Sequence, residues 1–175
     1  MDVHAGGVAR GVRLALLVAG AALAAGCAAA ARSTSAGPAP DEAQGVIRAA
    51  EALFAGMETR DTAALRRLFA PEARVVSMRV QEGVDPVVQT RSASEFIASI
   101  GRSTEVLRER IWAPRVEVRG NMAALWAPYL FYLGERFSHC GVDAFHFVRT
   151  GGAWRIVALT YTVQPESCEI VLDAR

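Results

Sequence analysis

The stretch from Phe137 to Thr162 carries the side chains best suited to chemistry on an otherwise apolar background. Its ionisable groups are His139 and Asp143, four residues apart, and Thr160 follows later in the stretch. A carboxylate in apolar surroundings loses hydration, which raises its pKa and suits it to general acid or base catalysis. We therefore take Asp143 as a candidate catalytic residue and His139 as its helper. Alternatively, Thr160 or a backbone amide holds Asp143 only to organise the fold.

Two adjacent glycines, Gly151-Gly152, predict a β-hairpin at this place, because a two-residue primed turn needs positive φ. Pairing of Thr150 with Ala153 would put Ile156 opposite Phe147, Ala158 opposite Phe145 and Thr160 opposite Asp143. Since side chains alternate along a strand, His139, Asp143, Phe145 and Thr160 would share one face, and His146 would lie on the other. Four strand residues span roughly 13 Å. His139 and Asp143 would thus flank one ligand without touching.

Aromatic residues on the preceding strands supply the walls of a predicted ligand pocket. A two-residue turn at Gly134-Glu135 pairs Trp126 with Asp143, whereas a one-residue bulge brings Ala127 there and turns Tyr129 towards the pocket. The sequence leaves both registers open. Glu109 and Arg110 are expected at a solvated strand edge. The candidate ligand-binding residues are Trp126, Tyr129, Phe145, Thr160 and Trp112.

The N-terminal segment predicts export. Arg10 and Arg13 precede an apolar run over residues 14–25, and residues 24–27 (AAGC) resemble a bacterial lipobox, with Ala24 where that motif prefers Leu. We predict a signal peptide over residues 1–27, a lipid on Cys27 and a flexible tether over residues 28–41. Ordinary cleavage among the following alanines is the alternative. The expected location is the periplasm or cell envelope of a bacterium, with membrane attachment only through the lipid.

Composition and motifs narrow the classes of function. The net charge is +1 and no basic cluster predicts nucleic-acid binding. No metal-ligand spacing, glycine-rich nucleotide motif or serine-hydrolase motif occurs, so we expect no metal and no cofactor. With Cys27 set aside, Cys140 and Cys168 form an even pair in an oxidising compartment. Three interpretations of this pair are open: a disulfide, two buried thiols, or a catalytic thiol.

The remaining elements predict an α+β domain. A helix is expected over residues 41–59, a second begins after the N-cap Asp61, and a third has the capping-box pair Ser92 and Glu95. Strands are expected over residues 73–80, 87–90, 105–118 and 122–133, before the hairpin. We predict one domain over residues 42–165, with a tail over residues 166–175, in which the helices cover one face of a curved, mostly antiparallel sheet.

Three segments carry a family resemblance: DTAAL at 61–65, LFAPEA at 68–73 and the GxDAFxFVRxxxxWRI pattern at 141–156. Together they resemble the nuclear-transport-factor-2-like superfamily, in its SnoaL-like and ketosteroid-isomerase-like bacterial branches, over about residues 43–163. The resemblance implies a cone-shaped, strongly bent sheet wrapped around three helices, a cavity at the wide end and a homodimer. It implies little about function, because one fold hosts many activities.

Three functions follow as alternatives. The first is an exported protein that binds a small, largely apolar molecule in its cone. The second is an isomerase, dehydratase or cyclase that uses Asp143 with His139. Ketosteroid isomerases place an oxyanion-hole Tyr on the first helix, and residues 43–59 contain none, which weighs against this reading. The third is a non-catalytic dimerisation or assembly module of the cell envelope.

Overall fold

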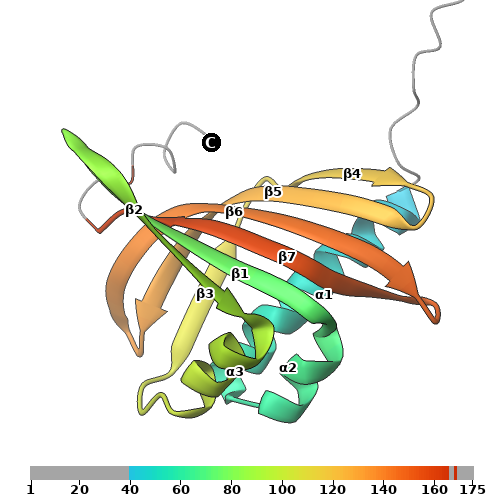
Figure 1. The fold of residues 1–175 in the computed structure, drawn as a ribbon, viewed down its shortest axis with the longest axis horizontal. Helices are drawn as coiled ribbons and strands as arrows, with labels where there is room; N and C mark the ends of the chain where they lie inside the picture. Colours follow the sequence, from blue (N-terminus) through green and yellow to red (C-terminus); the bar gives the residue numbers. More distant parts are fainter. Residues whose placement is uncertain (1–39, 166–167, 169–175) are drawn as a thin grey trace, which may run out of the picture. The chain divides into compact units, whose positions relative to one another are not determined.

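The computed structural model describes residues 40–165 and Cys168 (Figure 1). These residues form three helices and seven strands. The helices are α1 (Pro40–Thr59), α2 (Thr62–Leu68) and α3 (Ala93–Gly101). The strands are β1 (Phe69–Gln81), β2 (Val84–Ser92), β3 (Leu107–Ile111), β4 (Arg115–Arg119), β5 (Met122–Leu133), β6 (Arg136–Thr150) and β7 (Ala153–Val163). The predicted α+β class is confirmed. No helix among the described residues is long and apolar enough to cross a membrane.

The helices form where local sequence favours them. Five α1 residues at helical spacing are buried against the sheet: Val46, Ala50, Leu53, Phe54 and Met57. The side chain of Asp61 caps α2 by accepting a hydrogen bond from the amide of Ala64 at 2.8 Å. Ser92 and Glu95 form the predicted capping box at the start of α3.

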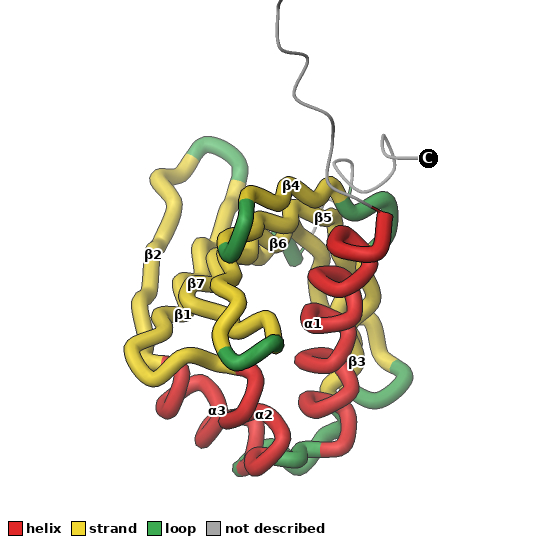
Figure 2. Tube along the Cα trace, turned by 90° about the vertical axis from the view of Figure 1, so that its right-hand side faces the viewer, coloured by secondary structure: helices red, strands yellow, loops and turns green. Residues whose placement is uncertain are grey.

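All seven strands belong to one mixed sheet. Its order is β2-β1-β7-β6-β5-β3, and β4 also pairs with β5. Only β1 and β7 are parallel neighbours; the other pairings are antiparallel. The strand predicted over residues 105–118 is two strands, because residues 112–114, with Ala113 at φ 43° and Pro114, interrupt it. The sheet bends around α1, and the helices lie on its concave side (Figures 1 and 2).

The concave face holds the core. Phe145 of β6 packs edge-on against Phe54 of α1, with 6.2 Å between ring centroids, and stacks on Phe147 at 5.5 Å. Two ion pairs tie α1 to the sheet at its two ends: Arg149 to Glu42 at 3.2 Å and Arg108 to Glu58 at 3.1 Å. Helix and sheet are thus fixed to one another around a common interior.

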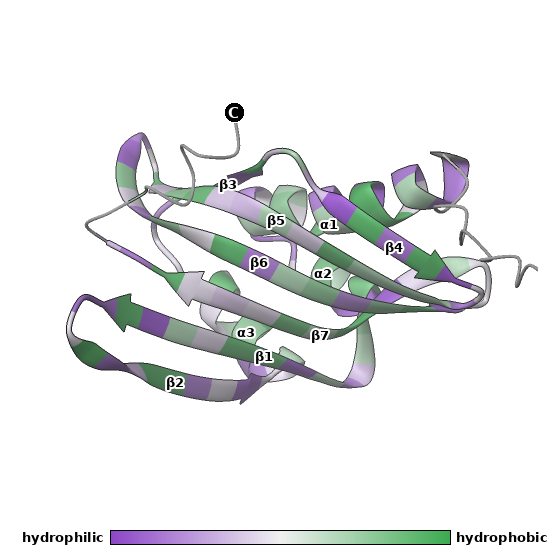
Figure 3. Cartoon of the chain, turned by 90° about the horizontal axis from the view of Figure 1, so that it is seen from above, coloured by the Kyte–Doolittle hydropathy of each residue, from purple (hydrophilic) through white to green (hydrophobic). Residues whose placement is uncertain are grey.

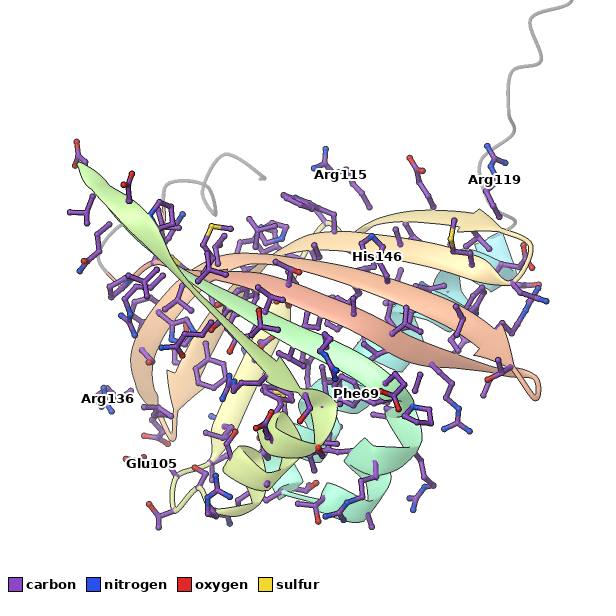
Figure 4. All side chains as sticks on the ribbon, in the orientation of Figure 1. Phe69, Glu105, Arg115, Arg119, Arg136 and His146 are labelled. Carbon is purple, nitrogen blue, oxygen red and sulfur yellow. A yellow bond between two sulfur atoms is a disulfide. The ribbon has the colours of Figure 1, made fainter. Side chains whose placement is uncertain are left out.

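The convex face is exposed and mixed in character. Hydrophilic and hydrophobic residues alternate over it (Figure 3). His146 and Arg115 lie on this face, away from the helices (Figure 4), so the predicted outward position of His146 is confirmed.

The hairpin of β6 and β7 follows the predicted register only near its turn. Gly151 and Gly152 have φ of 58° and 78°, and Phe147 pairs with Ile156 as predicted. Beyond that pair, β7 contains one extra residue, a β-bulge between Ile156 and Ala158. Phe145 therefore pairs with Leu159 rather than Ala158, and Asp143 pairs with Tyr161 rather than Thr160.

The register between β5 and β6 is the bulged alternative. Phe131 pairs with His139, but Tyr132 pairs with Phe137, which leaves Ser138 as the extra residue. Asp143 consequently pairs with Ala127, and Tyr129 faces the interior.

Candidate functional site

A cavity of about 700 Å³ lies between the concave face of the sheet and helices α1 and α3. Its apolar lining comes from both layers and includes Leu53, Phe96, Ile100, Phe131 and Leu159. Its polar lining is equally prominent and includes two carboxyl groups, two tyrosines, a histidine and three arginines: Glu109, Asp143, Tyr129, Tyr161, His139, Arg79, Arg91 and Arg102. The cavity is therefore mixed in polarity, unlike the apolar pocket predicted from the sequence.

A pair of carboxyl groups is the most unusual feature of this cavity. Asp143 of β6 is 2% exposed, and its side chain is hydrogen-bonded to that of Glu109 on β3. Oδ2 of Asp143 is enclosed and receives no backbone N–H or hydroxyl hydrogen bond from the described residues. The Glu109 carboxyl, when it carries a proton, is the donor at hand. Two carboxyl groups in contact share one proton, because two like charges so close cannot both ionise.

Burial sets the protonation of this pair. Loss of hydration raises the pKa of Asp143 to about 7, while the hydrogen bond from Glu109 partly opposes that rise. Loss of hydration also raises the pKa of Glu109, well above its usual range, and the neighbouring Asp143 charge raises it further. Glu109 therefore holds its proton and donates it to Asp143, which titrates near neutrality, so the pair presents acceptor oxygens to the cavity.

Tyr161 and Arg91 extend the polar surface from the carboxyl pair. Tyr161 lies directly opposite Asp143 across the β6–β7 pairing. Its hydroxyl accepts a hydrogen bond from Nη2 of Arg91 at 3.0 Å and also bonds the side chain of Ser77. Burial raises the pKa of Tyr161, so the phenol stays neutral at physiological pH.

The hydroxyl of Tyr129 is used in a hydrogen bond within the protein. It donates a 2.6 Å hydrogen bond to the carbonyl oxygen of Thr162, and burial is the main cause of its raised pKa, with the Asp143 charge second. Between these strands, Gly141 leaves no room for a side chain, because a Cβ there would overlap the Thr162 carbonyl. Glycine at position 141 therefore permits the close approach of β6 to the Thr162 carbonyl of β7.

His139 lines the same cavity but does not form a unit with Asp143. Its ring stacks on Phe131 at 4.8 Å and meets Tyr129 edge-on at 5.7 Å, and its Nδ1 is 3.1 Å from the hydroxyl oxygen of Ser138. Burial, with a smaller contribution from the charge of Arg79, lowers the pKa of His139 to about 4. His139 is therefore a neutral aromatic wall at physiological pH, and the partner of Asp143 is Glu109.

Four predicted ligand-binding residues lie outside the cavity lining. Trp126 is 47% exposed on the convex face, because the β5–β6 bulge brings Ala127 opposite Asp143. Thr160 is turned outward by the bulge in β7. Phe145 is on the inner face but is packed into the core at 1% exposure. Trp112 comes after the end of β3 and is absent from the lining. Tyr129 is the one predicted aromatic that lines the cavity.

Glu109 and Tyr161 are the residues that the sequence interpretation missed. Glu109 was expected at a solvated edge, but β3 pairs with β5 and turns Glu109 inward. The sequence contained one indication of this inward position: Leu107 and Ile111, two residues before and after Glu109, are apolar and share its face of the strand. Nothing in the local sequence reports that a bent sheet brings β3 over β6.

Two further predicted features concern cysteine and metal chemistry. The structure joins Cys140 and Cys168 in a disulfide, with Cα atoms 5.8 Å apart, which attaches the segment after β7 to β6. Cys27 lies outside the described residues. Within the part of the chain that the structure describes, no three His, Cys, Asp or Glu side chains are grouped to hold a metal ion.

Comparison with known protein families agrees with this fold and assigns the chain to a family. Residues 41–162 match the family model described as putative lumazine-binding, and the chain belongs to that family. This family match, together with the shared fold of the solved structures below, confirms the predicted nuclear-transport-factor-2-like superfamily. No curated protein matches the chain.

Solved structures of the same fold come from several bacteria. A protein of unknown function with a cystatin-like fold from Nostoc punctiforme is 9% identical, with a TM-score of 0.60 over 76% of this chain and 98% of that one. The beta subunit of a putative aromatic-ring-hydroxylating dioxygenase from Novosphingobium aromaticivorans is 15% identical, with a TM-score of 0.59 over 75% and 95%. A putative dehydratase of the NTF2-like family from Streptomyces avermitilis is 20% identical, with a TM-score of 0.52 over 71% and 98%. These similarities concern the fold.

Proposed function

We propose that this protein binds a small cyclic molecule in the cavity and that the Glu109–Asp143 carboxyl pair is its polar anchor. The observation that carries the proposal is a buried Asp143 that faces a half-buried Glu109 at the wall of a cavity. Burying ionisable groups opposes folding, and groups with strongly shifted pKa values cluster at functional sites. A volume of about 700 Å³ is ordinary for a small-molecule site.

The chemistry of the lining favours a ring that carries both donors and acceptors. The carboxyl pair offers acceptor oxygens and the arginines of the lining offer N–H donors. The phenol of Tyr161 adds another polar group, and Phe96 and Phe131 supply aromatic walls. Lumazine, which the family description names, is a planar heterocycle with adjacent N–H and C=O groups. It is therefore the first ligand to test.

The test is a titration of the protein with lumazine, followed by calorimetry or ligand fluorescence, together with native mass spectrometry for a co-purified molecule. We expect Asp143→Asn to weaken binding at least tenfold, because loss of a charged hydrogen bond costs about 1.5–3 kcal/mol. Asp85→Asn, at an exposed position on β2, is the matched control and should bind like the unaltered protein. Absence of both lumazine binding and any co-purified molecule would reject the proposal.

An acid–base enzyme of the isomerase, dehydratase or cyclase kind is the second candidate. One observation favours it: the pKa of Asp143 is raised to about 7, where a carboxyl group both accepts and returns protons efficiently. Asp143 would move the proton, and Glu109 in place of His139 would assist it. Asp143→Asn then abolishes turnover of a bound ligand. If the unaltered protein never changes its bound ligand, this candidate fails.

We also propose that the protein is exported and that it forms a homodimer, each on its own observation. The apolar segment and the AAGC sequence at residues 24–27 support a lipid on Cys27, which mass spectrometry of the processed N-terminus would detect and Cys27→Ser would remove. Trp126 and Met122, 47% and 62% exposed on the convex face, support a homodimer through the sheet. Light scattering of the protein and of Trp126→Asp tests that dimer.

A further inference from the structure

Three arginines of the cavity lining form no ion pair with another described residue. Arg79 belongs to β1, Arg91 to β2, and Arg102 follows α3. The ion pairs within residues 40–165 are Arg108–Glu58 and Arg149–Glu42. The carboxyl groups of the cavity, Glu109 and Asp143, are bonded to one another and carry at most one charge between them. The lining therefore has an excess of positive charge.

Arg91 is the arginine whose position is best fixed. One of its N–H groups donates to the Tyr161 hydroxyl, and its guanidinium lies 5.6 Å above the ring of Phe96. Its Nε is enclosed and has no acceptor among the described residues. The charge of Arg91 contributes to lowering the pKa of Glu95, but Glu95 is exposed and already accepts hydrogen bonds from Ser92 in the capping box. A fixed guanidinium with unused donors suits a carboxylate, which matches its planar fork.

We propose that the ligand of this cavity is an organic anion, a ring bearing a carboxylate, and that Arg91 binds the carboxylate. The inference rests on the proposed function. Tyr161 lies between Arg91, which it touches, and Asp143, which it faces across the strand pair. The carboxyl pair repels an anion and accepts a donor. The ligand is thus oriented with its anionic group towards β1 and β2 and its uncharged N–H or O–H edge towards Glu109 and Asp143.

Two probes of nearly equal size, one anionic and one neutral, test the inference. 2-Naphthoate and 2-naphthamide differ in the charge of one group, and their fluorescence reports binding to the full chain directly. We expect the naphthoate to bind at least tenfold more tightly, because charge-assisted hydrogen bonds are about twice as strong as neutral ones. Added NaCl should reduce that preference in the unaltered protein.

Arg91→Gln should bring the ratio of naphthoate to naphthamide affinity down to about one, and Arg91→Lys should retain part of the preference. Arg110→Gln, at an exposed position on β3, is the matched control and should keep the full preference. Ser99→Phe fills the cavity and should remove binding of both probes. Should Arg91→Gln fail to fold, the salt dependence and Arg91→Lys carry the test.

The outcomes separate this inference from the proposed function. Equal binding of both probes, removed by Ser99→Phe, would overturn the anion preference and leave the small-molecule site standing. A naphthoate preference that survives in Arg91→Gln would also overturn it. Absence of binding by either probe and by lumazine would overturn both the site and the preference.

Discussion

The buried carboxyl pair makes a quantitative prediction about stability. Asn has the shape of Asp but no charge, so Asp143→Asn removes the ionisation while Glu109 can still donate its proton to the amide oxygen. In the folded protein the pKa of Asp143 is raised to about 7 from an ordinary value of 3.8. A raised carboxyl pKa means that the unfolded chain loses its proton first as the pH rises.

The sign follows from proton linkage. Between about pH 4 and pH 7 the unfolded state binds fewer protons at this site than the folded state, so stability falls with rising pH in that window. Each pH unit is worth about 1.4 kcal/mol, so the shift corresponds to roughly 4 kcal/mol. Below pH 4 both states are protonated and the ionisation of Asp143 has no effect. Asp143→Asn should therefore be neutral at pH 4 and more stable by roughly 2–4 kcal/mol at pH 8, the lower figure allowing for relaxation around the charge.

The assay is urea unfolding of the oxidised protein, monitored by tryptophan fluorescence at half-unit intervals from pH 4 to pH 8. The informative quantity is the difference in free energy of unfolding between Asp143→Asn and the unaltered protein, because His139 titrates in the same window and cancels from that difference. Asp85→Asn, at an exposed position, should give a difference near zero throughout. A difference for Asp143→Asn that does not grow with pH would falsify the buried-pair assignment.

Three further predictions concern neighbouring features. The pKa of His139 is lowered to about 4, so the folded protein loses stability as the pH falls from about 6.5 to 4. In the same urea assay, His139→Phe should be more stable than the unaltered protein by roughly 1–2 kcal/mol at pH 4.5 and equally stable at pH 8. Gly141→Ala would press a methyl group into the Thr162 carbonyl, so we expect a loss of roughly 1–3 kcal/mol, and an unchanged thermal midpoint would contradict this. The Cys140–Cys168 disulfide closes a loop with a sequence separation of 28, so Cys168→Ser should lower the free energy of unfolding by about 3 kcal/mol. Dithiothreitol should have no further effect on this variant. A variant as stable as the unaltered protein would refute the contribution of the disulfide to stability.

Local features of the sequence determined the elements of this fold. The helix over residues 41–59, the N-cap Asp61 and the capping box of Ser92 with Glu95 all depend on interactions within a few residues. The turn at Gly151-Gly152 does as well, because its positive φ values are a property of glycine. The segments at 61–65, 68–73 and 141–156 that resemble the superfamily are also short local patterns, so the sequence by itself indicated the superfamily.

Tertiary structure alone decided which side chains meet in the cavity. Single-residue bulges in β6 and β7 exchange the faces of everything beyond them, so they put Tyr129 and Tyr161 inside and left Trp126 and Thr160 outside. No local pattern records a bulge that long-range pairing imposes. Glu109 meets Asp143 only because β3 reaches across a bent sheet. The sequence by itself thus identified Asp143 as an acid in apolar surroundings, and the tertiary structure supplied the partner that shares its proton.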